Sequence, residues 1–548
     1  MKKLFLLVVL FIMAASVSHA DANKVESQTS LFLRQVDNTG IVKCGTPLIV
    51  GLLQGDSDES RAFKSAYVSA TRPEKQTFAD SPAGHIRVHY DTSGTDAPSL
   101  TDSNMNGIPD YVDSTLVYLE YAWQVTVVTL GYGIPNTDGN LGGGQDKVDC
   151  YIDELGLINY YGFTMPDGTG TSTSSYITID NNYFDNIYLT KGYNALKVTT
   201  AHEFFHVIHF SYYSGSDAVW WMEQTAVWME DHAWDNVNDY VNYIPFIYDN
   251  RDYPLDTSNG SFEYGAGLNA MHIAQRYGDE YIRYIWNAFK SSRNGKIVNL
   301  DSVLPQGLAQ SISDLGVWLY FTGTRTNSND FFRDAHLFNE TITPQKIVSE
   351  SGAGDSLSFR HYTFKYIDIT PMSGFSSGDS LHFKFTTPNG GTWKNQVILF
   401  NEPQNYSIQQ VSGNNPFVII PRPFEKAILV VTNSSQENKS YLFSYDITIV
   451  ATTGVEDDPL PHHFVLSQNY PNPFNPTTTI SFTIPESGDV TVDIFNVAGQ
   501  KVASLVNGQM NAGSHSVVWD ASDFSAGVYF YSIKAGNYTR TMKMTLLK

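Results

Sequence analysis

Two histidines and a glutamate fall within five consecutive residues, His202-Glu203-Phe204-Phe205-His206. Residues four positions apart share one face of a helix, so both imidazoles can bind the same zinc ion. Glu203 then points at the zinc-bound water and can take its proton as the water attacks an amide carbonyl. The spacing therefore predicts a catalytic zinc site on a helix. The alternative is a core helix whose histidines face solvent.

A catalytic zinc site needs a third protein ligand. Metzincins would have glycine at position 209 and histidine at position 212, but this chain has His209 and Tyr212 there. Glu223 lies in a second predicted helix, which can pack against the first and supply a carboxylate. Glu230, seven residues later, shares that face, so it is either an outer partner that orients a ligand histidine or a competing ligand. His209 is seven residues from His202 on the same face, and we expect it to be either a packed histidine or an outer partner of the site.

The two motifs together, H-E-x-x-H followed by E-x-x-A-x-x-x-E, resemble those of the gluzincin metalloproteases. The stretch from Trp220 to Asp231 is particularly similar to the W-W-M-E-x-T-A-x-W-M-E-D segment of a family of secreted bacterial metalloproteases. The resemblance covers residues 85 to 300 and implies a zincin-like α+β fold. It implies that the zinc ligands are His202, His206 and Glu223. It also implies that Glu203 is the general base and that Glu230 is an outer partner of a ligand histidine. One departure is the number of residues between His206 and Glu223, which is sixteen and thus smaller than in the best-known gluzincins.

Charge develops on the carbonyl oxygen during amide hydrolysis, so an oxyanion stabiliser is also expected. Tyr264, in Glu263-Tyr264-Gly265-Ala266, resembles the tyrosine that some gluzincins place there, although a packing tyrosine is equally consistent. We expect residues 176–180 to form the edge strand that pairs with an extended substrate. Two other functions remain open: a surface adhesion or binding protein with an idle zinc domain, and an aminopeptidase. The intact Glu203 disfavours an idle site, and no clear acidic motif for a substrate amino terminus is found.

The loop from Asp102 to Asp113 matches a calcium-binding pattern. Positions 1, 3, 5, 9 and 12 carry oxygen side chains and position 6 is glycine, as in an EF-hand-type loop. The predicted ligands are Asp102, Asn104, Asn106, Asp110 and Asp113. Aspartate instead of glutamate at the last position shortens the reach and weakens the site. We predict a structural calcium ion, and the alternative is an Asn/Asp-rich turn that caps the next helix.

The chain has two cysteines, Cys44 and Cys150, which are too few for a disulfide scaffold or a zinc ribbon. Cys44 lies in Lys43-Cys44-Gly45-Thr46-Pro47, which resembles the cysteine switch of secreted metalloprotease proforms. That resemblance implies that the thiolate takes the open fourth position on zinc and excludes water. A Cys44–Cys150 disulfide is the equal alternative in an oxidising compartment.

Helices and short strands must position these residues, and the pattern predicts both between residues 85 and 350. Apolar residues recur at helical spacing in 111–130, 195–213, 220–234 and 265–277. Alternating patterns predict strands over 85–90, 147–152 and 175–179. Residues 21–80 show no strong period. We predict a propeptide over 21–80 and a zinc metalloprotease domain over 81–350.

After residue 355 the period of the apolar residues changes to two, which is typical of all-β sandwiches. We predict a sandwich over 355–450, an acidic linker over 451–463 and a second β unit over 464–548. In the last unit, the segments 468–476 and 525–531 closely resemble the type A sorting domain of the type IX secretion system. The resemblance implies that the protein is secreted or held at the cell surface, with the secretion machinery as a partner. A carbohydrate-binding sandwich is the alternative.

The amino terminus and the composition agree with export. Lys2 and Lys3 precede an apolar run that ends in Ser18-His19-Ala20, which is typical of a signal peptide over 1–20 rather than a membrane anchor. The chain has 34 Lys plus Arg against 56 Asp plus Glu, and its net charge of -22 argues against general affinity for nucleic acid or anionic membranes. We expect no transmembrane segment in the mature chain.

The sequence patterns predict a multidomain protein with a mixed α and β domain followed by two all-β sandwich domains. The gluzincin resemblance implies that the first of these is a zincin-like α+β metalloprotease domain. The expected function is a secreted endopeptidase, made as a zymogen, that hydrolyses protein or peptide substrates. The expected cofactors are Zn2+ for catalysis and Ca2+ for structure.

Overall fold

The computed structural model describes residues 42–547, apart from 70–71, 144–145, 327–330, 350, 370–378, 403–404, 412–416, 422–423, 451–464 and 537. The predicted signal peptide (1–20), the first part of the predicted propeptide (21–41) and the predicted linker (451–463) lie outside the described residues. The described residues belong to two units, Met1–Ala451 and Thr452–Lys548.

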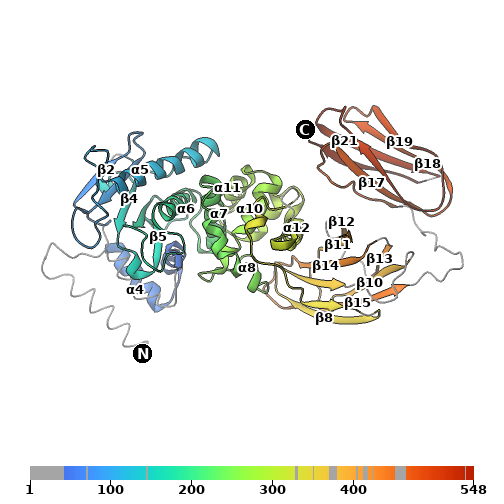
Figure 1. Cartoon of the computed structure of the whole chain (residues 1–548), viewed down its shortest axis with the longest axis horizontal. Helices are drawn as coiled ribbons and strands as arrows, with labels where there is room; N and C mark the ends of the chain where they lie inside the picture. Colours follow the sequence, from blue (N-terminus) through green and yellow to red (C-terminus); the bar gives the residue numbers. More distant parts are fainter. Residues whose placement is uncertain are drawn as a thin grey trace. The chain divides into compact units, whose positions relative to one another are not determined.

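A six-stranded mixed sheet in the first unit supports the helix that contains His202 and His206 (Figure 1). β3, β4 and β6 run parallel to one another, whereas β5 is antiparallel to β6. β1 pairs in parallel with the outer edge of β5. β3 to β6 are buried at every residue, as expected for a sheet that is covered on both faces. The strands, in spatial order, are β1 (Val42–Cys44), β5 (Tyr160–Pro166), β6 (Ser175–Asp180), β4 (Val148–Asp153), β3 (Ile86–Tyr90) and β2 (Thr77–Asp80). The predicted edge strand, 176–180, is therefore internal, because β5 covers its edge.

Helix α6 (Gly192–Tyr212) lies against β5 and β6, and α7 (Val219–Ala233) packs on α6. Residues 198–212 of α6 are all buried, which is typical of a helix enclosed on every side. Gly162 of β5 permits the close approach of α6, because a Cβ at this position would lie 2.8 Å from Thr199 Cγ2 and 3.1 Å from Glu203 Cγ. The helix that contains the histidine pair is thus held directly against β5.

The helices expected from the sequence are confirmed within a few residues. The expected helix over 111–130 is α5 (Asp110–Trp123), continued by one π-helical stretch, η1 (Gln124–Thr129). The α-helices that follow α7 are α8 (Pro245–Asp249), α9 (Phe262–Gly265), α10 (Gly267–Tyr277), α11 (Glu280–Ser292) and α12 (Gly307–Tyr320).

The described part of the predicted propeptide, residues 42–80 apart from 70–71, contains more helix and strand than its sequence suggested. It forms β1, then α3 (Thr46–Gln54) and α4 (Asp58–Ser69). Ile49 and Leu53 of α3 and Phe63 of α4 join a hydrophobic cluster with Tyr160 and Phe163 of β5. The apolar residues of each helix span only one or two turns, and a stretch this short does not reveal a helical period.

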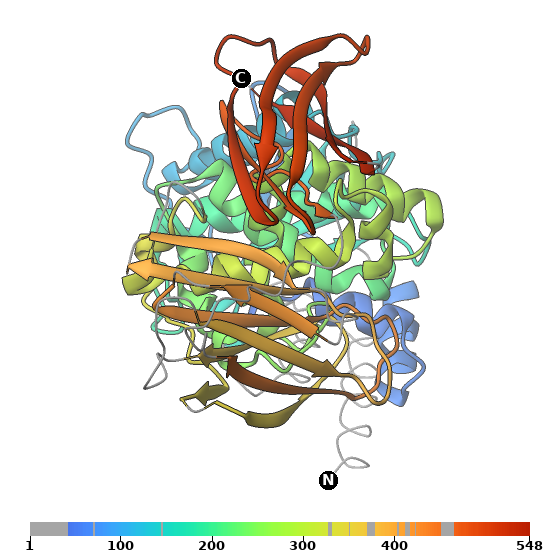
Figure 2. The same ribbon diagram turned by 90° about the vertical axis from the view of Figure 1, so that its right-hand side faces the viewer.

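The expected change to β structure is confirmed in two places. In the first unit, the sheets β13-β10-β15-β8 and β12-β11-β14-β9-β7 share one core and form a sandwich (Figure 2). Its strands are β7 (Lys346–Val348), β8 (Ala353–Phe359), β9 (Thr363–Ile369), β10 (Ser380–Thr386), β11 (Asn395–Glu402), β12 (Asn405–Val411), β13 (Phe417–Pro421), β14 (Lys426–Asn433) and β15 (Tyr441–Val450). Helix α12 packs on this sandwich, where Tyr366 Oη donates a 2.6 Å hydrogen bond to the Gly316 carbonyl.

The second unit is also made of two sheets around one core, β16-β17-β20 and β19-β18-β21-β22. Its strands are β16 (Val465–Leu466), β17 (Thr477–Ile484), β18 (Gly488–Asn496), β19 (Lys501–Met510), β20 (Gly513–Asp520), β21 (Gly527–Ala535) and β22 (Tyr538–Leu546). The multidomain α/β-then-β order expected from the sequence is thus confirmed.

Candidate metal centre

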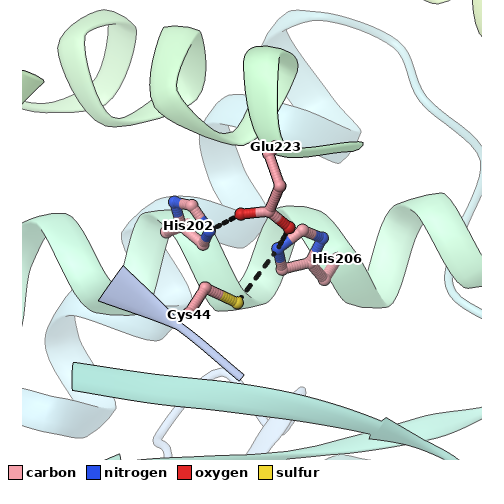
Figure 3. Close-up of side chains that lie close together, drawn as sticks. All are labelled: Cys44, His202, His206 and Glu223. Atoms are coloured by element: carbon pink, nitrogen blue, oxygen red, sulfur yellow. Dashed lines mark hydrogen bonds and ion pairs between the residues drawn. The ribbon is translucent and has the colours of Figure 1, made fainter. Parts of the chain in front are cut away.

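Four side chains from three elements of the chain converge at one buried point (Figure 3). His202 and His206 come from α6, Glu223 from α7 and Cys44 from β1. Glu223 Oε2 lies 3.2 Å from His202 Nε2, Glu223 Oε1 lies 3.1 Å from His206 Nε2, and Cys44 Sγ lies 3.4 Å from His206 Nε2. One ligand atom from each of the four lies within 4.8 Å of the others. The structure therefore brings the predicted ligand set together and adds the predicted switch cysteine to it.

The donor set and its spacing fit zinc. Ligand atoms at about 2.0–2.3 Å from a tetrahedral zinc lie about 3.3–3.7 Å from one another. The three separations above are close to these values. Imidazole, carboxylate and thiolate are also the ligands that zinc prefers. A small cation of this type can therefore be held by these residues with little rearrangement.

A second carboxylate orients His202. Glu230 Oε1 lies 2.6 Å from His202 Nδ1, so the ring donates Nδ1–H to Glu230 and turns Nε2 towards the cluster. The other oxygen, Glu230 Oε2, accepts a 2.6 Å hydrogen bond from Lys43 Nζ, which also pairs with Asp239. Burial alone would lower the pKa of Lys43, but attraction to Asp239 and Glu230 raises it above its ordinary value. The predicted outer role of Glu230 agrees with this geometry.

A hydrogen-bonded chain orients His206. Thr225 Oγ1 donates to the Trp221 carbonyl at 2.7 Å, so it accepts from His209 Nε2 at 3.1 Å. His209 Nδ1 is then an acceptor and receives the Nδ1–H of His206 at 3.2 Å. This order leaves His206 Nε2 with a free lone pair at the cluster. His209 also stacks on Trp286 at 4.2 Å, which confirms its expected packing role.

Burial keeps both ligand imidazoles neutral, as metal binding requires. It lowers the pKa of His206 to about 4 and lowers that of His202 as well.

Glu203 is buried beside the cluster, on the side that faces β5. Its Oε2 accepts a 2.8 Å hydrogen bond from Thr164 Oγ1 and a 3.4 Å hydrogen bond from Thr46 Oγ1. Its Oε1 accepts none from any residue that the structure describes. Burial raises the pKa of the Glu203 carboxyl group above its ordinary value. One oxygen is therefore fixed and the other is left for a further partner.

Both cysteines are free and buried, so the Cys44–Cys150 disulfide considered from the sequence is not formed. Cys150 lies in β4, within the hydrophobic core of the sheet, and Cys44 lies in the metal cluster. Burial, together with the Glu203 and Glu223 carboxylates, raises the pKa of the Cys44 thiol well above its ordinary value. A cation between these groups would offset their charge and allow the thiolate to form.

The main chain around Cys44 lies along β5 as an added strand. Val42 pairs with Tyr160 and Cys44 with Gly162, and Gly45 N donates to the Gly162 carbonyl at 2.9 Å. Tyr264 Oη lies 3.2 Å from Cys44 N and 3.3 Å from the Cys44 carbonyl oxygen. The predicted oxyanion residue is therefore buried at the cluster and in contact with the main chain that crosses it.

The predicted calcium ligands lie in one surface loop and in the first turn of α5, which follows it. Asp113 Oδ2 accepts hydrogen bonds from Asn104 Nδ2 at 2.9 Å and Asn106 Nδ2 at 2.8 Å, and Asp102 Oδ2 accepts from Gly107 N at 2.9 Å. Asp110 begins α5 and binds the main chain and hydroxyl group of Ser103 instead. The loop is closed by its own hydrogen bonds, as a turn that precedes a helix would be, and calcium binding stays a prediction.

Several residues at the centre were not anticipated from the sequence. Thr164 binds Glu203, Thr225 supports His209, and Lys43 and Asp239 lie next to Glu230. Their types are common and their partners are distant along the chain. Among these residues, only Lys43 could have been singled out from the sequence, because it is next to Cys44.

Residues 468–546 match the family model of the secretion system C-terminal sorting domain. The chain therefore ends in a type IX sorting domain, and the protein is secreted or attached at the cell surface. No curated protein matches the chain. Among the described residues, no helix combines the length and the apolar character needed to cross a bilayer.

Solved structures share only partial likeness with the chain. PorZ, a surface component of the type IX secretion system of Porphyromonas gingivalis, is 16% identical over 22% of this chain and 15% of its own, with a TM-score of 0.12. Latent PorU from the same organism is 14% identical over 38% of this chain and 22% of its own, with a TM-score of 0.16. A Faecalibacterium prausnitzii β-glucuronidase is 12% identical over 34% and 38%, with a TM-score of 0.13. The chain thus spans well under half of each, and these likenesses carry no argument about function.

Proposed function

We propose that this protein is an exported, zinc-dependent endopeptidase that is synthesised in a latent form. The observation that carries the proposal is the convergence of His202, His206 and Glu223 around one point, with the free oxygen of Glu203 beside it. Three protein ligands, a nearby carboxylate and one further ligand position are the components of a catalytic zinc site. The two-histidine, one-glutamate set also agrees with the gluzincin resemblance of the sequence.

Zinc, when bound, would act as a Lewis acid and lower the pKa of a water molecule towards neutrality. Glu203 Oε1 would accept the proton of the attacking water and then deliver it to the departing amine nitrogen. Thr164 holds the other oxygen of Glu203, so the carboxylate keeps its orientation during both transfers. Tyr264 would donate a hydrogen bond from its hydroxyl group to the carbonyl oxygen as negative charge develops there.

Strand β5 would bind the substrate main chain. In the described structure β1 occupies its outer edge, with Cys44 in register with Gly162. An extended peptide could form the same kind of hydrogen bonds along this edge once β1 has left. The sequence expectation of an edge-strand platform therefore applies to β5 in this proposal.

Cys44 would keep the precursor inactive. Its sulfur lies within the cluster, 3.4 Å from His206 Nε2, at the place where water must enter. A thiolate in the fourth position would exclude that water until the segment is removed. This is the switch suggested by the sequence, and the free state of both cysteines supports it over the disulfide.

The test is casein digestion by the secreted protein, with cut-site mapping. Activity should be lost on zinc chelation and regained on zinc addition. Glu203→Gln should abolish hydrolysis but retain zinc, because the ligands are unchanged. Glu120→Gln is the matched control, since Glu120 also accepts a hydrogen bond from a hydroxyl group, that of Ser81, but away from the cluster. Hydrolysis that survives both chelation and Glu203→Gln would refute the proposal, and an idle zinc domain would bind zinc without any digestion.

A further inference from the structure

A buried lysine lies beside the metal centre, in a pocket made by other parts of the chain. Lys43 Nζ is 2.6 Å from Glu230 Oε2, pairs with Asp239, and lies 4.4 Å from the centre of the Tyr243 ring. Lys43 is only 4% exposed, Asp239 2% and Glu230 1%. Two carboxylates and an aromatic face around one ammonium group make a complete cation site.

The walls of this pocket do not depend on the segment that fills it. Glu230 comes from α7, where it is also held by His202, and Asp239 and Tyr243 come from η5 (Asp239–Tyr243). Asp239 accepts a further hydrogen bond from Thr190 Oγ1. The pocket is therefore built by α7, which also carries Glu223 of the metal centre, and by η5, whereas Lys43 enters it from β1.

Lys43 is the neighbour of Cys44, the residue whose sulfur lies in the metal cluster. The two residues thus occupy the cluster and the pocket as one short extended segment along β5. If this segment leaves, two buried carboxylates lose their counter-charge, and isolated buried charges are costly. A cation from another source would then be strongly favoured in the same place.

We infer that the pocket formed by Glu230, Asp239 and Tyr243 is a specificity pocket that takes a lysine side chain of the substrate, from one of the two residues that flank the cleaved bond. This rests on the proposed peptidase function. In the precursor, Lys43 occupies the pocket in place of that substrate side chain. The proposed substrates are therefore proteins or peptides with lysine at the cleavage site.

The occupant is a side chain rather than a peptide amino terminus. The main chain on both sides of Lys43 is paired with β5, at Val42 and Cys44, and only the long side chain reaches the carboxylates. The compact ammonium group of lysine can lie between the two carboxylates and over the ring. The planar guanidinium of arginine needs a different arrangement of acceptors, so lysine should be preferred to arginine.

The first test measures binding in the full chain and needs no activity. Lys43→Ala leaves the pocket without its cation, and n-butylammonium chloride can replace the missing side chain. We expect n-butylammonium to raise the melting temperature of Lys43→Ala with increasing dose, while n-butanol with sodium chloride does not. The rise should disappear in the double variant Lys43→Ala/Asp239→Asn. If both solutes act equally, or if Asp239 has no influence, the cation pocket is refuted.

The second test uses the secreted wild-type enzyme on matched peptides that carry lysine, arginine or norleucine next to the bond that is cut. We expect kcat/KM to be highest for lysine, at least 10-fold above norleucine, and Asp239→Asn to reduce this ratio towards one. Cleavage without a preference for lysine would overturn the pocket but not the peptidase. Release of single amino-terminal residues would overturn the side-chain assignment. If no peptide is cut in the presence of zinc, the proposed function is refuted. The n-butylammonium experiment then still tests whether the pocket binds a cation. This peptide comparison also remains decisive if Lys43→Ala does not fold.

Discussion

Replacement of Glu230 by glutamine should weaken zinc binding without removing a ligand. Glu230 Oε1 lies 2.6 Å from His202 Nδ1 in a buried environment, and this bond turns Nε2 towards the cluster. Loss of such an outer carboxylate costs about 10- to 100-fold in metal affinity. That range corresponds to about 1.4–2.7 kcal/mol of binding free energy. Glutamine keeps a carbonyl acceptor but loses the charge, so the effect should fall near the lower end.

The assay is equilibrium competition for zinc between the purified full-length protein and a chromophoric chelator. Glu120→Gln is the matched control, because Glu120 Oε2 lies 2.9 Å from His85 Nδ1 in the same kind of bond outside the cluster. Glu223→Gln should cost more than Glu230→Gln, because Glu223 contacts both ligand histidines. If Glu230→Gln changes the affinity by less than about threefold, the orienting role fails. A larger loss for Glu230→Gln than for Glu223→Gln would make Glu230 the third ligand.

Three further predictions concern the scaffold and its export. Gly162→Ala should lower the free energy of unfolding by about 1–3 kcal/mol in urea titrations, because the added Cβ would press on Thr199 and Glu203; an unchanged midpoint would show that α6 can move away from β5. The double change Asp102→Ala and Asp113→Ala should abolish a calcium-dependent rise in melting temperature, since an ion that binds only the folded state stabilises it; no calcium shift in the wild type would make the loop a turn alone. Deletion of 464–548 should leave the protein folded inside the cell envelope, and its normal appearance in the medium would contradict the sorting role.

The helix pair and the side chains that it brings together could be predicted because their signals are local. The spacing of His202 and His206 places both on one helical face wherever that helix lies. The position of Glu223 near the histidines could be predicted because a second amphipathic helix follows closely in the sequence and must pack on the first. The same local reasoning predicted the β-rich part of the chain, since alternation with a period of two needs only a few residues.

Contacts between distant segments could not be predicted in this way. Lys43 and Glu230 are separated by 187 residues, and nothing in either local pattern links them. The position of β5 at the sheet edge, in place of the expected 176–180 strand, depends on strand order, which periodicity does not encode. Cys44 illustrates the same limit, because its sequence context was compatible with both a switch and a disulfide, and only tertiary placement separates them.

The central claim is a zinc ion held by His202, His206 and Glu223 and closed by Cys44 in the precursor. Zinc-edge X-ray absorption of the purified full-length protein tests it most directly. The expected spectrum has one sulfur ligand at about 2.3 Å and three nitrogen or oxygen ligands at about 2.0–2.2 Å. The sulfur contribution should vanish in Cys44→Ala, while the zinc remains. A wild-type spectrum without sulfur would contradict the closure by Cys44, and a protein that binds no zinc would contradict the metal centre itself.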